Sequence, residues 1–347
     1  MSAAALPRQP EAPEPASDAL LQVEDLKTVF HTEVGIVHAV DGVSFEVNSR
    51  EVLAIVGESG CGKTVTALSI MGLLPRPAGQ IVGGSIRYRG RDMVRMHPEE
   101  RRAMRGDRIA MIFQDPLTAL NPVHRVGAQI AELMLAHRDI SRRDAWARAV
   151  ELLKLVGIPS AGERARDYPH QFSGGMRQRV MIAMAIALDP DLLIADEPTT
   201  ALDVTVQAQI MDLLAEIQEE RRMGLILITH DLGVVAEVAD RIAVMYAGRI
   251  VEHADARSLY ASPGHPYTAA LLESLPRLDQ KGETLYTIKG LPPSLLNIPS
   301  GCPFHPRCRR AQDVCRSEVP RQVRLGLGRT SACHFAEEVI ASGGVHS

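Results

Sequence analysis

Short apolar runs recur along the chain and predict buried strands. Each is four or five residues long and contains no polar residue, which is typical of a parallel sheet covered on both faces. The runs are Val52–Val56, Ile109–Phe113, Leu192–Ala195, Leu225–Ile228 and Ile242–Met245. Helical patterns lie between the last three, at Val204–Glu219 and Gly233–Ala239. This β-α-β-α-β order predicts an α/β fold with a sheet wrapped by helices.

The remaining segments show other periodicities. Leu21–Phe30 and Val43–Val47 space β-branched or aromatic residues by polar ones and predict strands. Val126–Leu155 repeats apolar residues at helical spacing and predicts an all-helical insertion. Three shorter elements are also expected: a helix at Val65–Leu74, a strand at Ser85–Tyr88 and a helix at Ala269–Leu275.

Composition narrows the class of protein. The 347 residues carry a net charge of −4 and only 4% aromatic residues, so neither charge nor stacking surface suggests nucleic-acid binding. Residues 1–19 are rich in Ala, Pro and Glu and predict a disordered tail, not a secretion signal. The longest apolar run, Val180–Leu188, is too short to cross a bilayer. We therefore expect a soluble chain that can dock on a membrane protein.

A glycine-rich sequence follows the first buried strand. GESGCGKT at 57–64 matches G-x-x-x-x-G-K-[ST] between a predicted strand and a predicted helix, the context in which this pattern binds nucleotide phosphates. Lys63 can reach the terminal phosphates, and the Thr64 hydroxyl can bind Mg²⁺. The alternative is a glycine-rich turn with a chance lysine. The residues expected at the nucleotide are Gly57, Ser59, Gly60, Cys61, Gly62, Lys63, Thr64 and Val65.

Two acids end another buried strand. Asp196 and Glu197 follow Leu192–Ala195, where paired carboxylates suggest a cation or a reaction. Asp196 fits the carboxylate that holds Mg²⁺, and Glu197 fits a base that polarises the attacking water. The alternative is two solvated acids at a strand end.

A second glycine-containing helix start precedes this strand. Ser173 would cap a helix that runs to Leu188, and Gly174 and Gly175 leave its first N–H groups open to an anion. An ordinary Ser-Gly helix cap is the simpler interpretation of the same residues.

Taken in order, these motifs resemble those of ATP-binding-cassette (ABC) ATPases. SGGMRQ at 173–178 is similar to their signature, Gln114 to their Q-loop and His230 to their switch histidine, while Ala201-Leu202-Asp203 resembles their D-loop. The resemblance implies a P-loop nucleotide-binding domain with a mixed sheet and a helical subdomain. Its boundaries would be about 20–258, with the helical subdomain at about 118–188.

The resemblance also implies roles for individual residues. Two cassettes would pack head to tail, so that Ser173, Gly174, Gly175 and Gln178 act on the partner's ATP. His230 would contact the γ-phosphate. Catalysis would involve Glu197, His230 and Gln114, and Mg²⁺ would be held by Thr64, Gln114 and Asp196. Phe30 is the candidate for stacking on adenine, although it can equally be a core residue.

The C-terminal segment, 259–347, resembles the extension of oligopeptide and dipeptide importer ATPases. The likeness lies in His265-Pro266-Tyr267 and in GCPFHPRC at 301–308. It implies an ATPase subunit on the cytoplasmic face of the cell membrane that energises peptide import. Its partners would be a second, related cassette, two permease subunits and an extracytoplasmic peptide-binding protein. Nickel, glutathione or microcin import is the alternative, and a soluble ABC ATPase is a more distant one.

Four cysteines crowd this extension at 302, 308, 315 and 333. A cysteine cluster in an intracellular chain suggests a metal before disulfides. The spacing lacks the close pairs of common zinc ribbons. The family resemblance implies a [4Fe–4S] cluster on Cys302, Cys308, Cys315 and Cys333, with zinc or unligated thiols as alternatives.

Overall fold

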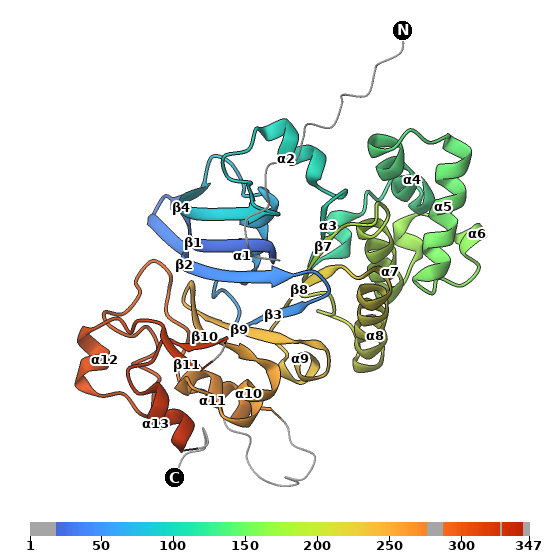
Figure 1. Ribbon diagram of the computed structural model, residues 1–347. Coiled ribbons are helices and arrows are strands. Elements are labelled where there is room, and N and C mark those ends of the chain that lie inside the picture. The colour runs from blue at the N-terminus through green and yellow to red at the C-terminus, as the bar shows by residue number, and fades with distance from the viewer. Residues whose placement is uncertain (1–18, 276–286, 327, 343–347) are drawn as a thin grey trace.

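The computed structural model describes residues 19–275, 287–326 and 328–342. Within these ranges an eight-stranded sheet forms the centre of the protein, in the order β11-β12-β10-β9-β3-β8-β7-β6 (Figure 1). All five apolar runs of the sequence are strands of this sheet, as predicted. Its strands are β3 (Val52–Val56), β6 (Ile109–Ile112), β7 (Leu192–Asp196), β8 (Gly224–Thr229), β9 (Arg241–Tyr246), β10 (Arg249–Asp255), β11 (Val323–Gly326) and β12 (Arg329–Ser331).

The central strands β9, β3, β8, β7 and β6 run parallel. β10 pairs antiparallel with β9, so the sheet is mixed. In the parallel part Val56 lies beside Thr229, and Asp196 lies beside Ile228. The carboxyl ends of β3, β7 and β8 therefore meet at one edge, the usual position of a ligand site in such sheets.

A second, antiparallel sheet has the order β2-β1-β4-β5. The predicted strands lie within this sheet, but the observed strands are longer. Register shifts in the β1–β2 and β1–β4 ladders allow each strand to continue where its apolar-polar alternation breaks. Ala19, predicted as the end of the tail, begins β1; the rest of that predicted tail lies outside the described residues. The strands are β1 (Ala19–Thr32), β2 (Gly35–Asn48), β4 (Gly79–Tyr88) and β5 (Arg91–Asp92).

The helical insertion predicted at 126–155 is confirmed as α4 and α5, which pack beside α7 at one side of the molecule (Figure 1). The helix predicted at Val65–Leu74 instead begins at Lys63 and ends at Met71, since Gly72 adopts a left-handed cap. α7 ends before the predicted Leu188 because Pro190 follows closely. The helices up to β10 are α1 (Lys63–Met71), α2 (Pro98–Met104), α3 (Pro116–Ala119), α4 (Val126–His137), α5 (Arg142–Leu155), α6 (Ala161–Arg164), the 3₁₀ turn η1 (Pro169–Gln171), α7 (Gly174–Ala185), α8 (Val204–Arg221) and α9 (Leu232–Val238).

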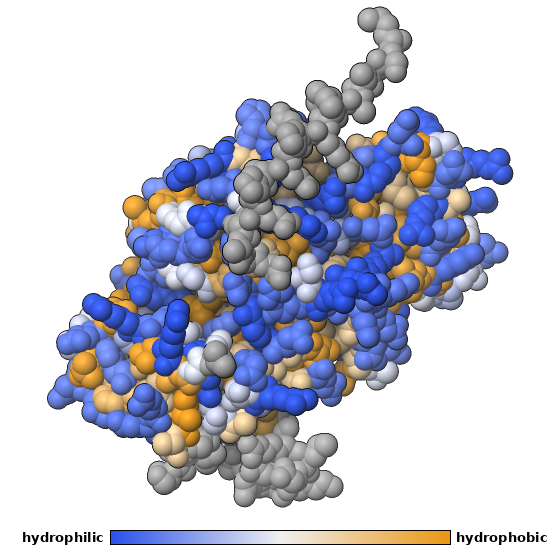
Figure 2. All heavy atoms as spheres, in the orientation of Figure 1, coloured by the Kyte–Doolittle hydropathy of each residue, from blue (hydrophilic) through white to orange (hydrophobic). Residues whose placement is uncertain are grey.

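Both faces of the parallel strands β3, β6, β7 and β8 are buried, which explains their uninterrupted apolar sequences. Ala54 and Val56 of β3 enter a core with the helices α4, α5, α7 and α8. Leu53 and Ile55, which point the other way, enter a second core with α1 and the antiparallel sheet. On the face shown in Figure 2, hydrophilic side chains predominate and apolar ones occur in small groups.

The C-terminal extension continues the large sheet, because β12 pairs with β10 and β11 pairs with β12. Its helix was predicted from Ala269 but begins at Pro266, where His265 accepts a hydrogen bond from the Tyr267 N–H as the cap. The extension helices are α10 (Ala256–Ala261), α11 (Pro266–Glu273), α12 (Asp313–Ser317) and α13 (Ala336–Ala341). Across the described ranges, none of the helices has both the length and the apolar character that a bilayer span requires.

Candidate functional site

The glycine-rich loop joins β3 to α1, as the sequence predicts. Gly62 has a φ of +108°, and a Cβ there would lie 2.3 Å from the carbonyl oxygen of Ala39. A side chain at this position would therefore displace the backbone of β2. The first N–H groups of α1 have no partner within the helix, so they can bind an anion.

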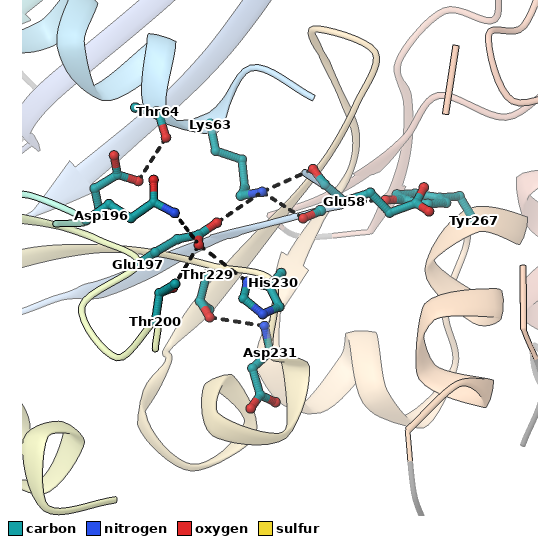
Figure 3. Close-up of polar contacts among 12 residues, drawn as sticks. Glu58, Lys63, Thr64, Asp196, Glu197, Thr200, Thr229, His230, Asp231 and Tyr267 are labelled. Carbon is teal, nitrogen blue, oxygen red and sulfur yellow. Dashed lines mark hydrogen bonds and ion pairs between the residues drawn. The ribbon is translucent and has the colours of Figure 1, made fainter. Parts of the chain in front are cut away.

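Lys63 is 4% exposed and extends from the first turn of α1 back over the loop (Figure 3). Its Nζ donates to the carbonyl oxygens of Gly57, at 2.8 Å, and Glu58, at 3.1 Å. The same Nζ lies 3.8 Å from Oε1 of Glu197. A positive charge is thus held where the loop, α1 and the end of β7 meet.

The Thr64 hydroxyl donates to Oδ1 of Asp196 at 3.1 Å, which joins α1 to β7. Asp196 is 1% exposed. Burial raises its pKa to about 6, and the nearby Glu197 carboxylate adds to the rise while Thr64 and Lys63 oppose it. The two side chains form an oxygen-rich site that a divalent cation would stabilise.

Glu197 is the centre of the polar cluster drawn in Figure 3. Its Oε2 accepts from Gln114 Nε2 at 3.1 Å and from the Thr200 hydroxyl at 2.9 Å, and lies 3.6 Å from Nδ1 of His230. Its φ of +46° is unusual for a non-glycine residue and indicates backbone strain of the kind found at functional sites. Gln114 and His230 were predicted from the sequence, but Thr200 was not, since its only signal was its position three residues after Glu197.

The signature-like residues lie elsewhere, at the start of α7. The Ser173 hydroxyl accepts from the Met176 N–H at 3.3 Å, which confirms the predicted cap. A Cβ on Gly175 would lie 2.7 Å from Cγ1 of Val206 on α8, so the glycine permits close packing of the two helices. Gln178 is buried. Within the described part of the chain, no hydrogen bond or ion pair joins Ser173, Gly174 or Gly175 to the glycine-rich loop.

The remaining predicted nucleotide contacts differ in exposure. Ser59 and Gly60 are exposed at the tip of the loop, and Val65 packs against the second core. Cys61 is buried, and burial raises the pKa of its thiol. A neutral, buried thiol reacts slowly with oxidants, so Cys61 lacks the features of an oxidation-sensitive residue.

Phe30 lies near the end of β1, where it pairs with Val37 of β2 and Gly79 of β4. Its side chain is half-buried, and a Cβ on Gly79 would lie 3.0 Å from Cε1 of the ring. This packing is compatible with a partly open aromatic face.

The four C-terminal cysteines line one cavity together with His265. Burial raises the pKa of the Cys302 thiol, and raises those of Cys308 and Cys333 to about 11 and about 12, with smaller contributions from the neighbouring thiols. In the described ranges, no group of three or more His, Cys, Asp or Glu side chains is placed to hold a metal ion.

Comparison with known proteins agrees with this geometry. The family model described as "ABC transporter" matches residues 40–200, and that described as "Oligopeptide/dipeptide transporter, C-terminal region" matches residues 251–315. Among solved structures, the dimeric ATP-binding cassette MJ0796 bound to ADP and Pi has a TM-score of 0.61 at 27% identity. That match covers 68% of this chain and 99% of the other.

Curated relatives are similar over nearly their whole length. The dipeptide transport ATP-binding protein DppD of Bacillus subtilis is 51% identical over 330 residues, which is 94% of this chain and 98% of the relative. The oligopeptide transport ATP-binding protein OppD of Escherichia coli is 50% identical over 317 residues, or 91% and 93%. With the nucleotide motifs assembled as described, the chain belongs to the ABC transporter family, in the group of ATP-binding subunits of oligopeptide and dipeptide transporters.

Proposed function

We propose that this chain hydrolyses ATP to energise the import of dipeptides or oligopeptides across the cell membrane. The convergence of Lys63, the Thr64–Asp196 pair and Glu197 at one sheet edge supports the hydrolytic part. The C-terminal match and the names of relatives such as DppD and OppD support peptides as the cargo.

In this proposal the glycine-rich loop, the N-terminus of α1 and Lys63 bind the β- and γ-phosphates. Phe30 stacks on adenine. Thr64, Asp196 and Gln114 hold Mg²⁺, which neutralises charge on the phosphates when bound. The buried Asp196 carboxylate fits this role because, among the residues that the structure describes, the one hydrogen bond it accepts comes from the neutral Thr64 hydroxyl, which leaves most of its charge uncompensated.

Glu197 polarises the water that attacks the γ-phosphate. Its contacts with Gln114, Thr200 and His230 fix the carboxylate, and Lys63 Nζ lies 3.8 Å from its Oε1. His230 is 61% exposed and can turn from Glu197 to the γ-phosphate. The reaction is an in-line phosphoryl transfer in which the protein supplies position and charge.

The N-terminus of α7, at Ser173, contacts the ATP that is bound to a second cassette. Its separation from the glycine-rich loop within the described chain is what a head-to-tail pair of cassettes requires. The further partners in this proposal are two permease subunits in the membrane and an extracytoplasmic peptide-binding protein, and the chain is peripheral on the cytoplasmic face.

Cys302, Cys308, Cys315 and Cys333 hold a [4Fe–4S] cluster in this proposal. The proposal is supported by the four cysteines lining one cavity and by the affinity of thiolates for iron–sulfur clusters. The cluster would stabilise the extension, and loading it would release the protons of these thiols.

Glu197→Gln tests the hydrolytic role. The variant should bind MgATP as the wild type does and lose at least about a hundredfold in turnover, because the amide cannot act as a base. Glu216→Gln, an exposed position on α8, is the matched control and should keep full activity. Near-normal hydrolysis by Glu197→Gln would remove Glu197 from its proposed role.

A further inference from the structure

The second residue of the glycine-rich loop, Glu58, is held by the C-terminal extension. Arg307 Nη1 donates to Glu58 Oε2 at 2.6 Å, and Nη2 donates to Oε1 at 2.9 Å. This is a bidentate pair between residues 249 positions apart in the sequence. The Arg307 side chain is 5% exposed and that of Glu58 is 25% exposed, so solvent screens the pair only weakly.

The backbone of the same loop residue is held as well. The Glu58 N–H donates to the Tyr267 hydroxyl at 2.9 Å, and Tyr267 is fully buried. In Figure 3 Glu58 extends toward Tyr267 and away from Asp196 and Glu197. The Tyr267 ring packs against Tyr246 and Phe304, with centroids 4.6 and 5.3 Å away. The tyrosine is therefore a rigid support, and its hydroxyl fixes where the loop backbone turns.

The negative charge of Glu58 links its contact with Arg307 to nucleotide binding. Glu58 places a carboxylate on the loop that receives the polyphosphate, and an unpaired carboxylate there would repel it. Arg307 neutralises that carboxylate, and the hydrogen bonds with Glu58 and Tyr246 raise the pKa of the guanidinium, which stays charged. Lys63 does not replace it, since its Nζ contacts the carbonyl oxygen of Glu58 and not the carboxylate.

We propose that Arg307 and Tyr267 are positioning residues for nucleotide binding, through which the C-terminal extension holds the phosphate-binding loop in shape and cancels the charge of Glu58. This rests on the proposed function only in that the loop binds ATP. Arg307 directly precedes Cys308, so the four-cysteine cavity and the contact to the loop share one segment. The extension is thereby part of the nucleotide site of its own chain.

The test is the Kd of the full-length chain for the magnesium complex of AMP-PNP, measured by calorimetry. Arg307→Ala should weaken binding about tenfold, because it leaves an unpaired carboxylate on the loop that binds the phosphates. Arg307→Lys keeps the charge without the fork and should recover part of the loss. Arg307→Ala combined with Glu58→Gln should recover more, since the repelling charge is gone. Arg324→Ala, on the exposed strand β11, is the matched control and should bind as wild type does.

Wild-type affinity in Arg307→Ala would overturn the inference, and so would an equal loss in Arg324→Ala. If Arg307→Ala does not fold, Tyr267→Phe carries the test: it keeps the ring and removes only the acceptor for the Glu58 N–H. An affinity loss of about threefold in that variant supports the inference, and an unchanged Kd overturns it. Failure of the wild-type chain itself to bind the nucleotide would instead contradict the proposed function.

Discussion

Asp196→Asn should stabilise the protein in the absence of nucleotide and Mg²⁺. The buried carboxylate has a pKa of about 6 instead of its ordinary 3.8. Between these two pH values the folded state binds the proton and the unfolded state does not, so stability falls as the pH rises through this window. Above pH 6 the cost to the folded state reaches about 3 kcal/mol, at ~1.36 kcal/mol for each pKa unit.

Asparagine has nearly the same shape and keeps an oxygen to accept from Thr64, whose hydroxyl lies 3.1 Å from Asp196 Oδ1. It carries no charge to desolvate, but its amide group needs an acceptor. The free energy of unfolding at pH 8 should therefore rise by about 1 to 3 kcal/mol. The gain should shrink as the pH falls through this window and approach zero below about pH 3.8, where the aspartate becomes protonated in both states.

Thermal unfolding of the metal-free, nucleotide-free chain between pH 4 and pH 8 measures this difference. Asp212→Asn, at an exposed position of α8, is the control and should change Tm little at any pH. Asp196→Asn should also lose the Mg²⁺-dependent part of ATP binding. A variant less stable than wild type at pH 8, or a gain that does not depend on pH, would refute the argument that burial of charge dominates at Asp196.

Two further predictions concern the signature helix and the cysteine cavity. Gly175→Ala should lower the free energy of unfolding by about 1–3 kcal/mol, because its Cβ would lie 2.7 Å from Val206. Gly174→Ala, whose Cβ would lie at an ordinary 3.6 Å from Leu202, should cost clearly less, and equal Tm values for the two would contradict the packing argument. Chain purified without oxygen should contain about four iron atoms and four acid-labile sulfides. Stoichiometric zinc without iron would exclude the proposed cluster.

The parallel strands and the polar cluster at their ends were predictable from local sequence. Val52–Val56 and Leu192–Ala195 lack polar residues because both faces of the sheet are covered. Strands of this kind end at a shared edge, which brings Asp196 and Glu197 to Lys63 and Thr64. The grouping of these residues at one edge of the sheet could therefore be predicted from residue types and order alone.

The features that the sequence did not predict depend on contacts between distant segments. β10 and β12 pair across 77 or more positions, and the pattern of neither segment indicates its partner. Thr200 donates to Glu197 because the chain turns sharply between the two residues. Glu197 has a φ of +46° in this turn. The Arg307–Glu58 pair joins the extension to the glycine-rich loop, and neither residue stands out in its own motif. Such pairings depend on tertiary packing, which the local pattern of apolar and polar residues does not indicate.

The central claim is that ATP binds between two cassettes. Its most direct test is a structure of the assembled transporter that carries Glu197→Gln, with ATP and Mg²⁺ bound. The γ-phosphate is predicted to lie between Lys63 of this chain and the signature helix of the second cassette. Nucleotide bound away from the 57–64 loop, or bound there with the second cassette's signature helix far from it, would contradict that claim.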